Sequence, residues 1–173
     1  MSLPGCLVEG VHDQLFANLR GFAKVAGVPE RMIYTPLSAT CGEAEVDWVR
    51  GFHKNAAAGI LGLLYVGAWK PSVERRMQAI AGTLVRNFMD ARVMSVEAVA
   101  ALRRDEEPSM FSCLLVPSIL GFSAWAFQGF VATVMERVTQ EKLTVLAVPS
   151  RAALKTAHPE LARVVESNFA VLE

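Results

Sequence analysis

One stretch of the sequence, residues 60–89, limits the possible folds more than any other. Residues 60–66 form a short apolar run of the kind that makes a buried strand, and residues 67–72 follow as a turn. From residue 73 to residue 89 apolar side chains recur with a period of 3.6, which predicts an amphipathic helix. Ser72 stands where a helix cap belongs. A buried strand, a tight turn and a helix in this order predict an α/β protein.

The turn has the position of a phosphate-binding loop but not its residues. Such a loop reads G-x-x-x-x-G-K-[ST], and its backbone N–H groups and lysine hold phosphate. Counted from Gly67, the lysine of that motif falls on Val73 and its Ser/Thr on Glu74, an acid that would repel phosphate. One inner glycine falls on Lys70, whose side chain hinders close approach of the backbone, and Pro71 removes an N–H donor.

Composition limits the size of the domain and the kinds of partner. The 173 residues suit one α/β domain with a short extension, and 53% hydrophobic residues support a large core. Lys plus Arg and Asp plus Glu both number 17, so the chain as a whole has no charge excess that favours nucleic acid. The three cysteines and three histidines are scattered, which predicts neither a disulfide framework nor a metal site. This cysteine usage, and an N-terminus without signal-peptide features, predict a cytoplasmic protein.

Residues 108–135 raise the question of a membrane span, because they contain no Asp, Glu, Lys, Arg or His. A spanning helix needs about 20 predominantly apolar residues. Pro117, Gly121 and Gly129 interrupt the run, however, and helical periodicity resumes only at Phe127. We therefore predict a buried strand, a loop and a helix instead of a membrane span.

The rest of the chain alternates between helical and apolar segments. A short helix within residues 1–25 is expected to bury Val11, Leu15, Leu19, Phe22 and Ala23, and another helix is predicted over residues 43–55. Further strands are predicted at residues 92–94, 111–117, 143–148 and 169–172, and further helices at residues 95–104, 127–142, 150–157 and 159–167. Apolar strands separated by helices predict a three-layer α/β/α domain with a five-stranded, mainly parallel sheet. This domain is predicted over residues 43–173, after an N-terminal helical extension and connector over residues 1–42.

Several segments between residues 26 and 173 follow a familiar order. Residues 26–32 (AGVPERM) form a connector, residues 63–65 a strand before the loop, residues 113–116 a second strand and residues 144–146 a later one. Gln128 and the pair Glu136 and Arg137 lie on the helix between the last two. This order resembles the ATPase domain of bacterial replicative-helicase loaders and transposition helper ATPases, both AAA+ P-loop proteins. The resemblance implies an AAA+/RecA-like P-loop sheet with strand order 5-1-4-3-2.

The catalytic groups that this resemblance implies are absent from the sequence. Pro117 and Ser118 stand where the family has the acids that hold magnesium, and no carboxylate lies anywhere in residues 108–135. The polar sensor expected after the fourth strand falls on Pro149. Phosphoryl transfer relies on the lysine, the metal and its carboxylate to neutralise charge in the transition state. We therefore predict a degenerate, non-catalytic ATPase domain without a cofactor.

Four residues of the turn make up the vestigial nucleotide loop, namely Gly67, Trp69, Lys70 and Ser72. We interpret Lys70 as a solvated turn lysine and Ser72 as a helix cap, with a shifted phosphate-binding pair as the alternative. Trp69 is expected to pack back on the domain, with a contact to a partner as the alternative.

Partner-binding candidates lie in two further places. Arg75 and Arg76 begin the predicted helix, where we expect a solvated face, with a partner contact as the alternative. Phe122, Trp125 and Phe127 are expected to form an aromatic cluster in a loop. Aromatic clusters are enriched at protein interfaces, and core packing is the other interpretation.

Three functions follow from these features. The first is a non-catalytic domain that acts by protein–protein interaction, as a regulator, inhibitor or scaffold of a DNA replication, recombination or transfer machine. Its expected partner is a replicative helicase or related AAA+ ATPase, and self-association is compatible with it. The second is a divergent nucleotide-binding enzyme, a weak ATPase or nuclease that uses Lys70 and Ser72. The third is a DNA-binding accessory protein that uses Arg75, Arg76, Arg86, Arg103 and Arg104, and the neutral net charge counts against it.

Overall fold

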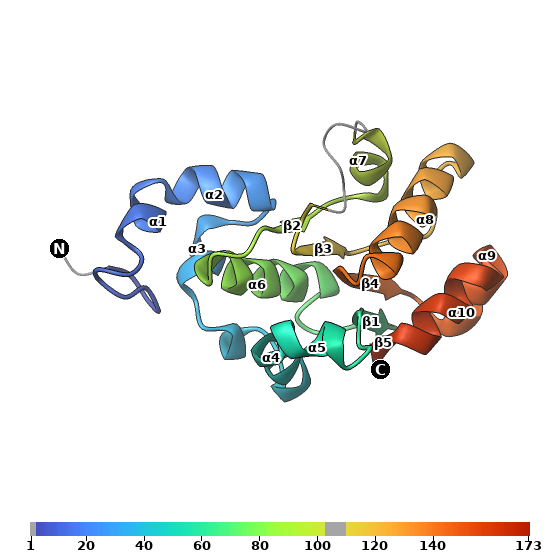
Figure 1. Cartoon of the computed structure of the whole chain (residues 1–173), viewed down its shortest axis with the longest axis horizontal. Helices are drawn as coiled ribbons and strands as arrows, with labels where there is room; N and C mark the ends of the chain where they lie inside the picture. Colours follow the sequence, from blue (N-terminus) through green and yellow to red (C-terminus); the bar gives the residue numbers. More distant parts are fainter. Residues whose placement is uncertain (1–2, 103–109) are drawn as a thin grey trace.

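Five parallel strands form one sheet at the centre of the structure, a computed structural model that describes residues 3–102 and 110–173 (Figure 1). The strands are β1 (Gly62–Val66), β2 (Ala91–Val93), β3 (Cys113–Val116), β4 (Leu143–Val148) and β5 (Phe169–Leu172). The helices are α1 (Asp13–Ala17), α2 (Leu19–Ala26), α3 (Glu30–Tyr34), η1 (Leu37–Ala39), α4 (Glu43–Arg50), α5 (Phe52–Ala57), α6 (Val73–Arg86), α7 (Val96–Ala101), α8 (Ala124–Thr139), α9 (Arg151–Ala157) and α10 (Pro159–Asn168).

The order of the strands confirms the predicted topology. The sheet runs β2-β3-β4-β1-β5, and every neighbouring pair is parallel. Counted from β5, this is the order 5-1-4-3-2. Strands β4 and β5 have the predicted bounds, whereas β1, β2 and β3 differ from them by one or two residues at an end. The prediction of a three-layer α/β/α domain is therefore confirmed.

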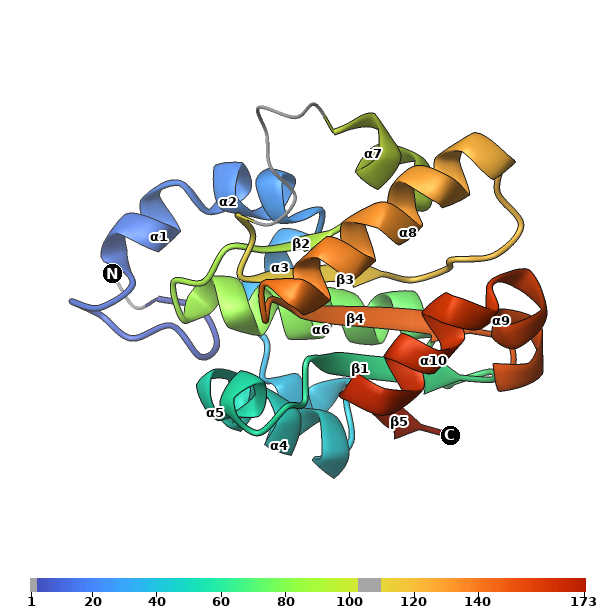
Figure 2. The same ribbon diagram turned by 45° about the vertical axis from the view of Figure 1, so that its right-hand side comes forward.

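Helices cover both faces of the sheet, as Figures 1 and 2 show, and alternate residues of β1 face these two layers. Leu63 and Tyr65 pack in one layer with α6 and the helices before β1. Leu64, between them, packs in the other layer with α7, α8 and α10. This alternation follows from the period of two along a strand. Because both faces are covered, the strands read as continuous apolar runs.

The N-terminal segment forms two short helices, α1 and α2, where the sequence predicted one. Leu15, Leu19 and Ala23 are buried as expected. The prediction is wrong for Val11 and Phe22, which are 56% and 42% exposed. The periodicity failed because the helix is interrupted at Asn18, which changes the direction of the chain between α1 and α2.

Four of the predicted helices have clearly different bounds in the structure. The helix predicted over residues 43–55 is divided at Gly51 into α4 and α5. The central helix α6 ends at Arg86, before the predicted residue 89. Helix α8 begins at Ala124 and not at residue 127, because the Ser123 hydroxyl accepts a hydrogen bond from the Ala126 N–H (3.3 Å) and caps it. Helix α7 ends at Ala101, and residues 103 and 104, predicted to continue it, lie outside the described residues.

Among the described residues no helix has the length and apolar character that crossing a membrane requires.

Candidate functional site

The loops that follow β1, β3 and β4 meet at the carboxyl edge of the sheet. Val66 at the end of β1 lies beside Val148 of β4, and Val116 at the end of β3 lies beside Leu146. In parallel α/β sheets this edge is where ligands bind. The vestigial nucleotide loop (residues 67–72), Pro117 and Pro149 therefore lie where the sequence placed them, on one side of the domain.

The side chain of Arg76 fills the inside of the vestigial nucleotide loop. Its Nε donates to the carbonyl oxygen of Pro71 (3.1 Å), and its Nη2 donates to the carbonyl oxygen of Lys70 (3.0 Å). The residue is only 9% exposed. The prediction of a solvated Arg76 is therefore wrong: the residue begins the second turn of α6 on the side that faces the loop, and the loop carbonyls bind it.

A buried carboxylate neutralises this guanidinium. Glu45 of α4 is 2% exposed, and its Oε1 accepts from Nη1 of Arg76 at 2.5 Å. The same oxygen accepts from the Tyr65 hydroxyl of β1 (2.9 Å), and Oε2 accepts from the Gly42 N–H (2.7 Å). A buried ion pair needs such additional hydrogen bonds to offset the cost of desolvation. Burial and the nearby Glu45 carboxylate raise the pKa of Tyr65, which keeps the phenol protonated and able to donate.

Trp69 closes the loop from outside and packs back on the domain, as expected. Its indole N–H donates to the carbonyl oxygen of Val66 (3.1 Å). Its ring meets the Tyr65 ring edge to face, with centroids 5.5 Å apart, and the Arg76 guanidinium lies 5.0 Å from the indole centroid. A cation beside an aromatic ring adds to the stabilisation of the charge. The alternative of a partner contact through Trp69 stays a prediction.

Polarity distinguishes this loop from one that holds phosphate. A phosphate-binding loop turns backbone N–H donors inward. Here two carbonyl acceptors, from Lys70 and Pro71, point inward to a cation. A cavity of about 290 Å³ remains at the same edge, lined in part by Glu74, Ser95, Ser118 and Phe122, and Glu74 is the one charged residue in its lining. Carbonyl oxygens and a carboxylate both repel an anion.

Ser72 and Lys70 have the roles that we expected for them, a helix cap and a solvated turn lysine. Ser72 caps α6, where its hydroxyl accepts from the Arg75 N–H (3.4 Å). Lys70 and Arg75 are exposed. Gly67 has a φ of +85°, a conformation that glycine adopts without strain, and its N–H donates to the carbonyl oxygen of Val148 (3.0 Å).

The aromatic residues near the start of α8 do not form one cluster. Trp125 lies in the first turn of α8 and is 67% exposed. Phe127 stacks on Phe130 and meets the ring of His158. Phe122 is half-buried in the loop before the helix. The prediction of a loop cluster is wrong because α8 begins early, at Ala124, so that Trp125 and Phe127 lie on a helix and not in the loop with Phe122.

Two further arginines, the buried Arg137 and the half-buried Arg86, donate to backbone carbonyls elsewhere in the domain. Arg137 of α8 donates to Thr144 Oγ1 (3.1 Å) and to the carbonyl oxygens of Phe111 (3.1 Å) and Leu143 (2.7 Å), and burial lowers its pKa to about 10. Arg86 donates to the carbonyl oxygens of Ile33 and Thr35. Of the arginines considered for DNA, Arg76 and Arg86 are thus engaged inside the protein, and Arg103 and Arg104 lie outside the described residues.

Few features of the sequence indicate the buried network of Glu45, Tyr65 and Arg76. Glu45 follows Gly42 by three residues at the start of a helix, a spacing that indicates a cap, and Tyr65 is the one polar side chain in an otherwise aliphatic strand. Nothing local indicates that both would reach Arg76, because 31 residues separate Arg76 from Glu45. In residues 3–102 and 110–173 no three His, Cys, Asp or Glu side chains gather as metal ligands would.

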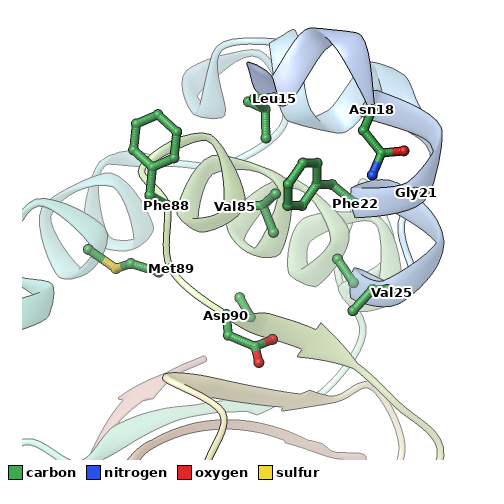
Figure 3. Close-up of a pocket in the computed structure, with 11 residues that line it drawn as sticks. Leu15, Asn18, Gly21, Phe22, Val25, Val85, Phe88, Met89 and Asp90 are labelled. Atoms are coloured by element: carbon green, nitrogen blue, oxygen red, sulfur yellow. The ribbon is translucent and has the colours of Figure 1, made fainter. Parts of the chain in front are cut away.

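A second hollow lies away from the carboxyl edge of the sheet, between α2, the end of α6 and the start of β2. This groove is a cavity of about 480 Å³, and Figure 3 shows Phe22 and Val25 of α2 on one side and Val85, Phe88 and Met89 on the other. Asp90 lies at its base. No pattern in the sequence indicates this groove, because the groove forms only when the interruption at Asn18 places α2 across α6.

Comparison with known proteins identifies the fold and nothing finer. No family model matches the sequence, and no curated protein matches it. One solved structure of similar fold is described as a DNA replication initiation factor, with a TM-score of 0.52 and 12% sequence identity. The match covers 77% of this chain and 47% of that one, so the chain spans about half the length of the protein that it matches. The likeness shows the fold alone, a five-stranded parallel sheet with helices on both faces.

Proposed function

We propose that this chain is a non-catalytic AAA+-like domain that acts by protein–protein interaction, as a regulator, inhibitor or scaffold of a DNA replication, recombination or transfer machine. The observation that carries the proposal is the Arg76 guanidinium inside the vestigial nucleotide loop. It binds the carbonyl oxygens of Lys70 and Pro71 and is neutralised by Glu45. Side chains of the domain itself thus occupy the place in which an ATPase would hold a triphosphate.

Nucleotide binding would have to break this arrangement. A phosphate in the loop requires the carbonyls of Lys70 and Pro71 to turn away, and Arg76 would then lose two of its acceptors. Each lost hydrogen bond to a charged group costs about 1.5–3 kcal/mol. No lysine of the P-loop motif and no magnesium-binding acid offsets that cost. Without the metal and its carboxylate, phosphoryl transfer loses its charge stabilisation.

The proposed partner is a replicative helicase or a related AAA+ ATPase. The support is the fold, which the chain shares with a protein described as a DNA replication initiation factor. A domain of this fold without turnover can take the place of an active subunit and block it, or hold other subunits in place. Either action depends on surface contacts and not on hydrolysis.

The first test measures nucleotide binding by titration of a fluorescent ATP analogue with Mg²⁺. We expect no saturable binding up to about 1 mM, an affinity that corresponds to about −4 kcal/mol. Lys70→Ala is the matched variant, since Lys70 is the exposed cation of the loop, and its titration is expected to equal that of the wild type. Sub-millimolar binding that Lys70→Ala abolishes would establish the nucleotide-binding alternative instead.

The second test addresses the partner. The chain is mixed with the purified replicative helicase and with the active AAA+ loader of the cell that carries it, with and without ATP. We expect a complex with one of them, and altered ATPase activity of the loader or altered helicase loading. Absence of a complex with both proteins would contradict the proposed partner, while the nucleotide titration would still decide whether the domain is catalytic.

A further inference from the structure

The ring of His12 fastens the N-terminal strap, defined as residues 3–11, to the end of α6. The strap contains no helix or strand and forms the dark-blue loop before α1 in Figure 1. His12 follows it directly and is 8% exposed. Its Nδ1 lies 2.8 Å from the backbone nitrogen of Val8, and its Nε2 lies 3.1 Å from the carbonyl oxygen of Arg86. Both ring nitrogens are therefore engaged, one by the strap and one by α6.

These two partners determine the protonation state of the ring. A backbone N–H can only donate, and a carbonyl oxygen can only accept. Nδ1 is therefore the acceptor from the Val8 N–H, and the ring proton is on Nε2, where it donates to the Arg86 carbonyl. The closed strap thus requires the neutral imidazole. In a protonated ring both nitrogens are donors, so Nδ1–H would point at the Val8 N–H instead of accepting from it.

The two hydrogen bonds of His12 differ in how they respond to a second proton. Nε2 donates to the Arg86 carbonyl in the neutral and in the protonated ring alike, and the carbonyl end of a helix favours a cation. The ring also stacks on Phe88, with centroids 5.6 Å apart, in either form. The bond from Val8 exists only with the neutral ring. Protonation therefore leaves His12 on α6 and releases the strap from it.

The charged groups around His12 do not compensate for the loss of this bond. Glu9 in the strap is exposed, and the Asp13 carboxylate already accepts from a backbone N–H of the strap (3.1 Å). Helix α6 contributes the Arg86 guanidinium, a like charge for a protonated ring, and the Cys6 thiol interacts with Arg86. In the described part of the chain no carboxylate forms an ion pair with His12.

The closed strap covers part of the core. Leu7 is 7% exposed and belongs to the apolar core that also contains side chains of β1 and α6. Next to it, the Cys6 N–H donates to the carbonyl oxygen of Tyr34 (2.9 Å). A segment without regular secondary structure opens at a lower free energy than the packed core does. Opening of the strap would remove Leu7 from the core and expose apolar surface beneath it.

We propose that His12 is a pH-sensitive switch: the neutral ring holds the strap closed, and protonation opens the strap and uncovers the surface under Leu7. The switch goes beyond the proposed function and involves no residue of the vestigial nucleotide loop. Histidine ordinarily titrates near pH 6.5, within the physiological range. The open form takes up a proton at Nδ1 that the closed form excludes. The closed strap is therefore fully favoured above about pH 6.5, and its stability falls as the pH decreases below that value.

The test is hydrogen exchange of the full chain at pH 7.5 and pH 5.5, with protection expressed relative to the intrinsic exchange rate at each pH. The amides of Cys6, Leu7 and Val8 are all hydrogen-bonded in the closed strap. In the wild type we expect them to lose protection by up to about tenfold for each pH unit below 6.5, because opening takes up one proton. The amides of β4 are expected to keep their protection.

Two variants at position 12 distinguish the switch from a general effect of acid. His12→Asn places an amide oxygen near the position of Nδ1 and does not titrate, so its strap is expected to stay closed at both pH values. His12→Phe keeps a ring against Phe88 but has no acceptor, so its strap is expected to be open at both. His158→Asn is the matched control, because His158 also accepts a backbone N–H through Nδ1, at the start of α10. Its strap is expected to respond to pH as the wild type does.

Two results would overturn the proposal. One is a wild-type strap that is equally protected at pH 7.5 and pH 5.5. The other is a loss of protection between these pH values that His12→Asn or His12→Phe shows to the same extent as the wild type, since another group would then be responsible.

Discussion

At the scale of single residues, the pair of Glu45 and Arg76 determines what the vestigial nucleotide loop can hold. Removing Arg76 alone leaves a carboxylate buried and unpaired, so Arg76→Met is expected to lower the free energy of unfolding by about 3–5 kcal/mol. The double variant Glu45→Gln, Arg76→Met leaves no buried charge and is expected to cost less than the sum of the two single changes. Urea unfolding followed by circular dichroism measures all three.

Two comparisons make this prediction specific to the buried pair. Arg75→Met, one residue earlier and exposed, is expected to change the free energy of unfolding by less than about 0.5 kcal/mol. Additive effects of Glu45→Gln and Arg76→Met would show that the two side chains do not interact, and would contradict the ion pair.

The buried cysteines give the stability of the protein a pH dependence. Burial raises the pKa of Cys41 to about 12 and that of Cys113 to about 12, from an ordinary value of 9.0. Above pH 9 the unfolded chain therefore loses thiol protons that the folded chain keeps. The free energy of unfolding is constant in this respect below pH 9 and falls as the pH rises above it, by at most about 1.4 kcal/mol per pH unit for each thiol.

Urea unfolding at pH 8, 9 and 10 measures this loss. The range stops at pH 10 because the lowered pKa of Arg137, about 10, acts in the opposite direction above it. Cys41→Ala is expected to reduce the fall between pH 9 and pH 10, since one of the two shifted thiols is gone. An equal fall in the wild type and in Cys41→Ala would show that the Cys41 thiol is not protected by the fold.

At the scale of elements, α6 is held against α3 by a glycine. A Cβ atom added at Gly82 would overlap the backbone carbonyl of Met32. Gly82→Ala is therefore expected to lower the free energy of unfolding by about 1–3 kcal/mol through overpacking, although alanine favours a helix more than glycine does. Thermal unfolding measures the effect.

The exposed position Arg75 of the same helix supplies the control for Gly82. Arg75→Ala changes helix propensity little and meets no neighbouring backbone, so it is expected to leave the melting temperature nearly unchanged. A Gly82→Ala variant that is as stable as the wild type, or more stable, would mean that α3 does not approach α6 as closely as described.

The sequence predicted elements well wherever one local signal decided them. The serine caps at Ser72 and Ser95 and the largely apolar strands β4 and β5 have their predicted places. The start of α8 was predicted three residues late, because in residues 108–135 apolar side chains occupy every face and periodicity has no contrast. The prediction for Phe22 was wrong for a different reason, because the interruption at Asn18 separates α1 from α2.

At the scale of the whole molecule, the fold was predictable and the centre of the site was not. Parallel pairing follows from the alternation of apolar strands and helices, whereas the strand order was implied by the resemblance to AAA+ ATPases. The ion pair between α4 and α6 is a contact across the fold, and only the packed structure brings Glu45 to Arg76. The predicted division at residue 42 stays a prediction, and the helices before it share one apolar core with β1 and α6.

The guanidinium held inside the loop has a consequence for control in time. ATPases of this fold change conformation when ATP binds and return when it is hydrolysed, so nucleotide turnover times their action. Here the charged group inside the loop is the Arg76 guanidinium, which is part of the chain and therefore neither binds nor dissociates. On the proposed function, such a domain has one state, and its effect on a partner depends on the number of copies present. Synthesis and degradation would then control that effect through the ratio of this chain to its target.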